Sequence, residues 1–523
     1  MDKHGSETYV ILGEGLVGES GGGRDAAART TLEAAAPPFR FRRVGPKGDQ
    51  LGEAVRRRLA SAMTSGGGGT SSVPAGYTYL GQFVDHDLTF DRTTVMLGTD
   101  VSPADLLQGR SPTLDLDSLY GAGPQNPASA KFYSDDRHLR TGRTARAGGD
   151  LAMDGFDLPR AGTGTTRKQK RTAVIPDPRN DENLAVAQTH TAFIRFHNRL
   201  VDTLPASTAA AQRFTRAREL AVKHYQWMIW HDYLPRIMAK SVLNSVMSGG
   251  RKLVEPSADP TDMPAMPVEF SVAAFRLGHS MIRRSYNWNA RFPDGQGTLD
   301  FLFIFSGTGG DLLGGLRLPS NWIADWRRMY DLAGETGRAD LAAPGGLNKA
   351  MRIDSALVNP LANLPTGSFG GPAVPFGDPI ANLAFRNLTR AKMLRLASGQ
   401  QMAALLRQRG VPVTTLTRAQ LRTGSNGASL DGLTATQRDS VLAKAPLWFY
   451  VLREAEMNGG KLKGVGARIV AETVHRAMEG SRFSIVRDEL FRPTLGPDST
   501  TFRMSDLLMF AFDRKKALLA PLT

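Results

Sequence analysis

The sequence predicts a mainly α-helical protein: a single large helical domain with long loops and few short strands. Several long segments repeat apolar residues at the three- and four-residue spacing of an α-helix, whereas strand patterns are short and weak. The 55 glycines and 30 prolines among the 523 residues punctuate the connections between these segments. No run of about 18 apolar residues occurs, so we expect no membrane span.

The first 70 residues differ in composition from the rest of the chain. They are poor in aromatic residues, rich in Gly and Ala, and carry glycine runs at 21–23 and 66–69. We expect residues 1–70 to form an N-terminal arm, extended and partly flexible, that wraps on the main body. Residues 71–523 would form the domain itself.

Helical periodicity is clearest from the middle of the chain onward. Residues 181–203 and 209–245 carry apolar residues at helical spacing, and Pro235 is expected to kink the second of these helices. Further helices are expected at 268–284, 379–397, 400–409, 435–456 and 465–480. The best strand candidate is the apolar run 301–305, and the basic run 167–171 is expected to be a solvated loop.

Composition excludes some chemistry and leaves other classes open. The chain has no cysteine, which excludes disulfides, thiolate metal sites and cysteine nucleophiles. A net charge of +15 should attract polyanions, but no nucleic-acid-binding signature is present, so we expect no specific nucleic-acid partner. The first residues lack a classical signal peptide, which leaves a cytoplasmic location and non-classical secretion both open.

The most informative motif lies at 81–90, where one histidine stands between two aspartates. On a helix, Gln82 and His86 would lie one turn apart on the same face, so that an amide and a base point into one space. Asp85 and Asp87 would point to either side. A solvated helix with an incidental histidine remains the alternative for this motif taken alone.

Three further motifs have a chemical and a structural interpretation each. In 177–183, Arg179 precedes Glu182 by three residues. The structural interpretation is a helix that Asn180 or Asp181 caps, with only a surface ion pair beside the cap. His279 follows a glycine, which would let a flat group approach the backbone closely, although a buried, satisfied histidine would look the same. In 382–390, an asparagine, Asn387, could accept the proton of a ligating imidazole.

A fifth motif alternates oxygen-bearing residues. Ser111, Thr113, Asp115 and Asp117 would turn four oxygens to one side of an extended loop, which suits a hard cation such as calcium. The spacing is not that of an EF-hand, and a polar turn without metal is the alternative.

The order of these five motifs resembles the animal-type haem peroxidase family, also called the peroxidase–cyclooxygenase superfamily, in a bacterial-looking form. The resemblance spans about residues 73–485. It implies a haem b cofactor with His279 as the proximal iron ligand, oriented by Asn387. On the other face, His86 would be the distal base, Arg179 would stabilise the charge that develops as the O–O bond breaks, and Gln82 would line the distal pocket.

The resemblance also implies roles for several charged residues. Asp85 and Glu182 match the carboxylates that form ester links to haem, while Asn183 stands where some relatives carry a methionine that forms a third link. Arg276 and Arg390 would pair with the haem propionates. The resemblance implies calcium bound by five residues: Asp87, Ser111, Thr113 through its carbonyl, Asp115 and Asp117.

Two kinds of enzyme occur in this family. Its fatty-acid dioxygenases need a tyrosine three residues before the proximal histidine, and here that position is Arg276. We therefore expect a peroxidase that reduces hydrogen peroxide and oxidises a small reducing substrate: a halide, thiocyanate or a phenolic donor. A fatty-acid dioxygenase is the runner-up, and a non-enzymatic polyanion-binding protein is a third possibility that explains the charge but not the motifs.

Overall fold

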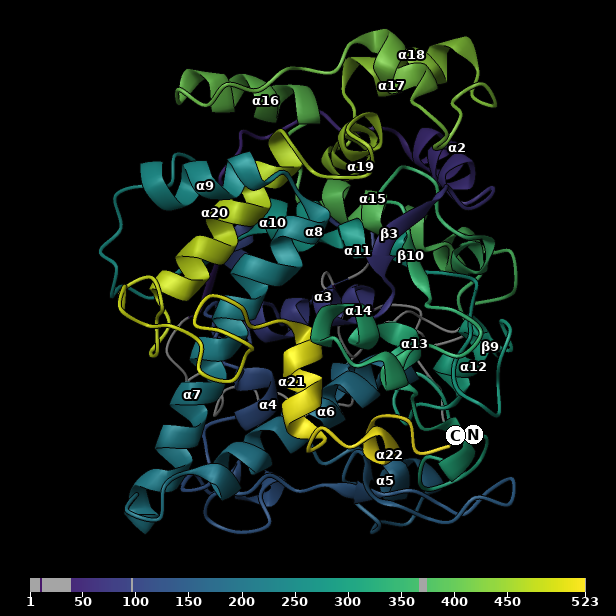
Figure 1. Ribbon diagram of the computed structural model, residues 1–523. Helices are drawn as coiled ribbons and strands as arrows, with labels where there is room; N and C mark the ends of the chain where they lie inside the picture. The colour runs from purple at the N-terminus through teal and green to yellow at the C-terminus, as the bar shows by residue number, and fades with distance from the viewer. Residues whose placement is uncertain (1–9, 12–38, 96, 366–373, 523) are drawn as a thin grey trace.

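The computed structural model describes residues 10–11, 39–95, 97–365 and 374–522. Helices of very different length pack around one buried apolar core, in agreement with the mainly α-helical prediction (Figure 1). None of the helices in these ranges has the length and apolarity that crossing a bilayer requires.

The N-terminal half contains the helices that surround the candidate site. They are α2 (Glu53–Met63), α3 (Gly76–Leu88), α4 (Asp117–Tyr120), α5 (Arg167–Arg171), α6 (Leu184–Thr203), α7 (Arg213–Met228), α8 (Leu234–Ile237), α9 (Lys240–Gly249), α10 (Val268–Val272), α11 (Gly278–Met281) and α12 (Leu299–Ile304). Short 3-10 segments lie among them, of which η3 (Pro178–Asp181) and η6 (Ala274–Leu277) matter for the site, and η5 (Ile229–Tyr233) is a π-helix.

The C-terminal half completes the core. Its helices are α13 (Trp326–Met329), α14 (Leu332–Thr336), α15 (Leu383–Met393), α16 (Gly399–Gln408), α17 (Arg418–Thr423), α18 (Ala435–Ala443), α19 (Leu447–Met457), α20 (Val465–Glu479), α21 (Met504–Ala511) and α22 (Lys516–Leu519). Figure 1 shows α16, α17 and α18 gathered at one end of the molecule, with α3 near its middle.

Strands are short and pair only in twos within the described ranges. The antiparallel pairs are β1 (Val10–Ile11) with β4 (Thr94–Val95), β3 (Thr70–Pro74) with β10 (Lys349–Met351), β5 (Gly142–Arg143) with β6 (Asp154–Asp157), and β8 (Ser285–Tyr286) with β9 (Gly297–Thr298). The parallel pair is β2 (Arg40–Arg42) with β7 (Ala265–Pro267).

Helix α3 is buried on nearly all sides, which explains its apolar sequence. The side chains of Tyr77, Leu80, Phe83 and Val84 are fully buried, and α6, α11 and η3 all contact this helix. Helix α6 starts where the side chain of Asn183 accepts a hydrogen bond of 3.0 Å from the backbone N–H of Val186, a typical N-cap. Together, α3, η3 and the start of α6 form one side of the candidate site.

Several expected elements differ from those observed. The run 301–305 lies in helix α12 and its C-cap, because the side chain of Thr298 caps a helix there, so the strand prediction was wrong. The basic run 167–171 is helix α5 rather than a loop, since Thr166 and Gln169 form a capping box at its start. The predicted caps Asn180 and Asp181 lie inside η3, whose actual cap is Asp177.

The longer predicted helices are broken. The helix at 209–245 contains the π-helix η5 immediately before Pro235, whose ring cannot donate a hydrogen bond. The helix at 268–284 consists of α10, η6 and α11, and 435–456 is divided into α18 and α19 around Pro446. Helices 181–203, 379–397, 400–409 and 465–480 are confirmed as α6, α15, α16 and α20, with shifted ends.

The predicted N-terminal arm lies largely outside the described residues, which begin continuously at residue 39. Its last part was expected to be extended but contains helix α2, which packs against α15. The side chains of Leu59 and Met63 are fully buried in the common core. The apolar residues on one face of α2 are the sequence pattern that indicates this helix.

Candidate functional site

A cavity lies between helix α3 on one side and the segment from η6 to α11 on the other. Its lining comprises Thr78, Tyr79, Gly81, Gln82, Asp85, Asn183, Tyr233, Phe275, Arg276, Gly278, His279, Ile282 and Phe303. Four of the predicted site residues thus face one space, although Gln82 and His279 are separated by nearly 200 positions in the chain. His86 is fully buried on α3 behind this lining and does not itself line the cavity.

The ring of His86 has a defined hydrogen-bond partner. Its Nδ1 lies 2.9 Å from Oδ1 of Asn180, in η3. A carboxamide oxygen can only accept, so Nδ1 carries the proton and donates it, and Nε2 is the basic nitrogen of the neutral ring. Asn180 therefore sets the tautomer of His86.

Arg179 is fully buried next to the same helix. It donates from Nη2 to the carbonyl of His86 at 2.9 Å and to the carbonyl of Thr89, and its Nε and Nη2 bond the two oxygens of Asp177 at 3.0 and 2.7 Å. A second guanidinium, that of Arg110, lies 2.6 Å from Asp177. Burial alone would raise the pKa of Asp177, but the two arginines outweigh it and hold this pKa well below its usual range.

The remaining polar residues of this side are connected to α6. Gln82 accepts a hydrogen bond of 2.9 Å from Nδ2 of Asn183, so the residue that caps α6 also orients a residue of the cavity wall. Glu182 is buried and interacts electrostatically with Arg179, as does Asp85. The structure therefore places both carboxylates near the same guanidinium.

On the opposite side, His279 is held by α15. Its Nδ1 lies 2.9 Å from Nδ2 of Asn387, and Oδ1 of Asn387 accepts a hydrogen bond of 3.3 Å from Nη1 of Arg276. The predicted pairing of His279 and Asn387 is present, but the amide nitrogen, rather than the oxygen, faces the imidazole. The reason is that Arg276 takes the carboxamide oxygen as its acceptor.

Arg390 is fully buried on α15 and stands near Arg276 and Asp91. Burial raises the pKa of Asp91 to about 6, although Thr93 and the two arginines act in the opposite direction. This group of one carboxyl and two guanidinium ions has a surplus of positive charge next to the cavity. Such a surplus suits an anionic group on a bound molecule.

The five predicted calcium ligands are neighbours but do not converge on one point. Asp87 accepts hydrogen bonds from the backbone N–H of Leu116 and of Ser118, whereas Asp115 accepts from Ser481 at 2.6 Å. Oγ of Ser111 lies 2.5 Å from Oγ1 of Thr113, which bonds Asp115 in turn, and Asp117 pairs with Arg218. Within the described ranges, no group of three or more acidic or histidine side chains is arranged for a metal ion. The present geometry therefore does not fit calcium.

Sequence reasoning missed four residues of the site. Asn180 and Asp177 were interpreted only as capping or flanking residues, and the role of Asn183 beside Gln82 was not foreseen. Tyr233, from the π-helix η5, lines the cavity, and burial raises its pKa well above its usual value. The only sequence signal for Tyr233 was Pro235, because a proline two residues on disturbs the preceding helical turn.

Two features of the residues in and around the cavity suit a flat cofactor. A Cβ atom added at Gly278 would meet no atom within 4 Å, so the glycine next to His279 leaves space at the wall. An imidazole, two carboxylates and two buried guanidinium groups are the donor types that haem binding uses: an axial ligand and partners for propionates. Fold and site together thus define a mainly helical protein with a histidine on each of two opposed segments.

A comparison of the sequence with models of known families finds one match in the part of the chain that contains this site. The model of the animal haem peroxidase family matches residues 72–301, which extend from the strand before α3 to α12 and contain both histidines. The region 72–301 is thus similar to the animal haem peroxidase family.

Named relatives agree with this assignment. Thyroid peroxidase from Canis lupus familiaris is 28% identical over 245 residues, which are 40% of this chain and 24% of the relative. Heme peroxidase 2 from Caenorhabditis elegans is 26% identical over 180 residues, 32% of this chain and 23% of the relative. The matching part of the chain thus spans about a quarter of the length of these relatives.

Solved structures show the same fold over nearly the whole chain. Peroxidase A from Dictyostelium discoideum has a TM-score of 0.58 and 16% identity, with 93% of this chain and 94% of that chain covered. Fatty acid alpha-dioxygenase from Arabidopsis thaliana has a TM-score of 0.53 and 14% identity, with 92% and 78% covered. At these identities the likeness concerns the fold alone.

Proposed function

We propose that this protein is a haem peroxidase that reduces hydrogen peroxide and oxidises a small anion, halide or thiocyanate, or a phenolic donor. The observation that carries the proposal is the hydrogen bond from Nδ1 of His86 to Asn180. It makes Nε2 the basic atom of a buried histidine, on the helix whose residues Gln82 and Asp85 line the cavity opposite His279. A base on one side and an imidazole ligand on the other are what peroxide reduction by haem requires.

The proposal assigns haem contacts to residues on both sides of the cavity. His279 would bind the iron through Nε2, which requires Nδ1 to carry a proton and the carboxamide of Asn387 to present its oxygen. Arg276 and Arg390 would pair with the propionates, and Asp85 and Glu182 are the candidates for ester links. When bound, haem supplies the oxidising chemistry, while the protein controls ligation, orientation and access.

The chain's own residues would then move one proton and stabilise one charge. His86 takes a proton from bound hydrogen peroxide and returns it to the oxygen that leaves as water. Arg179 provides a fixed positive charge for the negative charge that develops in this step. Asp177 holds Arg179 by two hydrogen bonds, so the guanidinium needs no rearrangement during the reaction.

The runner-up is a fatty-acid dioxygenase of the same superfamily. Arg276 occupies the position at which the resemblance would require a radical-bearing tyrosine, which favours the peroxidase. Turnover with peroxide against bromide, iodide, thiocyanate and a phenol, compared with a fatty acid plus oxygen, distinguishes the two activities.

The decisive experiment compares His86→Ala with His279→Ala. We expect His86→Ala to keep haem but to react with peroxide about 10²- to 10⁴-fold more slowly in stopped-flow measurements, because a general base is lost. We expect His279→Ala to lose haem or its iron–imidazole spectrum. His138→Ala is the control, because this histidine bonds Asp135 and Asp202 and lies outside the cavity lining. An unchanged rate in His86→Ala would exclude the proposed base.

Two finer proposals are tested on the same purified protein. Ester links at Asp85 and Glu182 predict haem that resists acidic organic extraction after peroxide turnover, and Asp85→Val or Glu182→Gln should each remove one link. Calcium remains a prediction from the sequence, and metal analysis after dialysis against a chelator tests it. Complete extraction of haem, or full activity without calcium, would reject the respective proposal.

A further inference from the structure

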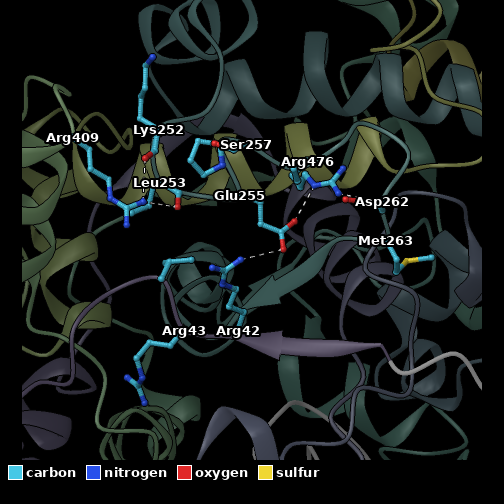
Figure 2. A pocket seen from close by; sticks show the side chains of 13 residues that line it. Arg42, Arg43, Lys252, Leu253, Glu255, Ser257, Asp262, Met263, Arg409 and Arg476 are labelled. Carbon is cyan, nitrogen blue, oxygen red and sulfur yellow. Dashed lines mark hydrogen bonds and ion pairs between the residues drawn. The ribbon is translucent and has the colours of Figure 1, made fainter.

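A second cavity is separate from the cavity of His279. It has a volume of about 770 Å³, and none of its lining residues also lines the cavity of His279. Its lining comprises Arg42, Arg43, Val44, Lys252, Leu253, Glu255, Pro256, Ser257, Ala258, Asp262, Met263, Arg409 and Arg476 (Figure 2). Five of these side chains are cationic and two are carboxylates, a surplus of three positive charges.

The carboxylate of Glu255 is already engaged. Glu255 lies 2.9 Å from Nε of Arg476 and 3.8 Å from Nη1 of Arg42, and Figure 2 shows it between the two arginines. Arg476 also bonds Glu479 at 3.2 Å and the carbonyl of Asp262 at 2.7 Å. Arg476 and Glu255 therefore form part of the wall rather than a binding group.

Other cations of the cavity have no carboxylate partner within the described ranges. Nη1 of Arg409 donates to the carbonyls of Lys252 and Leu253 at 3.1 and 3.0 Å, an arrangement that Figure 2 shows directly. Arg43 donates to the carbonyls of Arg395 and Leu394. Carbonyl oxygens fix the position of a guanidinium without neutralising its charge, so these arginines remain able to bind an anion.

The wall behind Arg409 is rigid. A single oxygen of Glu472 accepts hydrogen bonds from three successive backbone N–H groups, those of residues 252, 253 and 254, at 2.9, 2.6 and 2.8 Å. On the other side, the parallel pairing of β2 with β7 holds the backbone of Arg42, whereas its side chain is 61% exposed. The backbone that carries Arg42 and the carbonyl partners of Arg409 is thus held in place before a ligand binds.

We propose that this cavity binds a small organic phosphate, with Arg409 and Arg42 as its main partners. Guanidinium groups bind phosphate by two parallel hydrogen bonds, and a phosphate monoester carries the multiple charge that a surplus of three cations attracts. The volume lies within the range of small-molecule sites, roughly 300–1,000 Å³, and exceeds what a bare phosphate needs. Val44, Leu253 and Met263 provide apolar surface for the organic part. This site is independent of the proposed peroxidase activity.

The test is calorimetric titration of the purified full chain with phenyl phosphate at constant ionic strength. We expect saturable binding at one site, and at least about tenfold weaker binding for Arg409→Gln and for Arg42→Gln. Arg42 is the safer variant for folding, because its side chain is 61% exposed and its only ion pair is the long one to Glu255. Arg418→Gln is the matched control, since this exposed arginine of α17 pairs with Asp439 away from the cavity.

Three results would overturn the proposal. The first is an absence of saturable binding to the wild-type chain. The second is equal weakening by Arg418→Gln, which would indicate the general field of a protein with net charge +15 rather than a site. The third is equally tight binding of benzoate, because a single negative charge would then suffice.

Discussion

At the scale of single residues, the tautomer of His86 depends on one asparagine. Asn180 accepts from Nδ1 of His86 at 2.9 Å, while its neighbour in sequence, Arg179, bonds the backbone carbonyl of the same histidine. Asn180 thus orients the ring of His86, and Arg179, the residue before it in η3, places a positive charge beside this histidine. This role could not be inferred from the sequence, in which Asn180 has the appearance of a helix cap.

Replacing Asn180 by alanine removes the acceptor and leaves the tautomer of His86 undetermined. We expect the reaction with peroxide to slow by about 10- to 100-fold, the range found when a partner that orients a functional histidine is removed. Asn180→Asp keeps an acceptor oxygen and should retain most of the rate. Stopped-flow kinetics on haem-loaded protein measure both variants, and equal losses in the two would assign Asn180 a merely structural role.

At the scale of elements, helix α2 supports the helix that carries Asn387 and Arg390. Leu59 and Met63 are buried where α2 contacts α15, and Arg56 and Arg57 lie over the ring of Phe385. The side-chain amide of Asn382, which caps α15, donates to Thr64 at 2.9 Å. Helix α2 therefore belongs to the folded unit that positions the proximal side.

Truncation of Leu59 to alanine should test this support. We expect a loss of about 2–5 kcal/mol in the free energy of unfolding, because a fully buried side chain leaves a cavity between α2 and α15. Arg58→Ala, at an exposed position of the same helix, should change the free energy by less than about 0.5 kcal/mol. Urea denaturation measures both, and similar small effects would mean that α2 does not stabilise the domain.

At the scale of the whole molecule, buried histidines and buried carboxyl groups oppose each other in the pH dependence of stability. Burial lowers the pKa of His190 to about 3, and of His197, His224, His231 and His475 to about 4. Burial raises the pKa of several carboxyl groups, among them Asp87 and Glu454 to about 7, and Asp91, Asp354 and Asp506 to about 6.

The signs of the two effects differ. Between pH 6.5 and about 4, the unfolded chain protonates the histidines and the folded chain does not, so acidification destabilises the fold. Between about pH 7 and 4, the folded chain keeps protons on the carboxyl groups that the unfolded chain loses, so acidification stabilises it. We therefore expect the free energy of unfolding to change little between pH 7 and pH 5.

Two variants separate these contributions. In His197→Gln, stability should rise on acidification relative to the wild type, by about 1.4 kcal/mol per pH unit. In Glu454→Gln, stability on acidification should fall relative to the wild type by a similar amount, because a carboxyl group that stabilises the fold when it is protonated has been removed. Urea denaturation at pH 7, 6 and 5 gives these slopes, and slopes of the same sign in both variants would contradict the account.

The sequence by itself determined the helical class, the identity of the motifs and their order along the chain. Helical periodicity and glycine–histidine or aspartate–histidine neighbours are local properties, so one sequence suffices to find α6, α15 and α20 and to select His86, Arg179 and His279. The pairing of His279 with Asn387 was also predicted, because the resemblance supplied a partner for a ligating imidazole.

Only the tertiary structure decided which groups meet and in which orientation. His86 bonds Asn180, Asp177 holds Arg179 by two hydrogen bonds, and Arg276 takes the amide oxygen of Asn387 as its acceptor. The predicted calcium ligands bond other groups: Asp87 accepts from the backbone N–H of Leu116, Asp115 accepts from Ser481, and Asp117 pairs with Arg218. Hydrogen bonds between residues distant in sequence depend on how helices pack, and packing is set by the whole core rather than by any single motif.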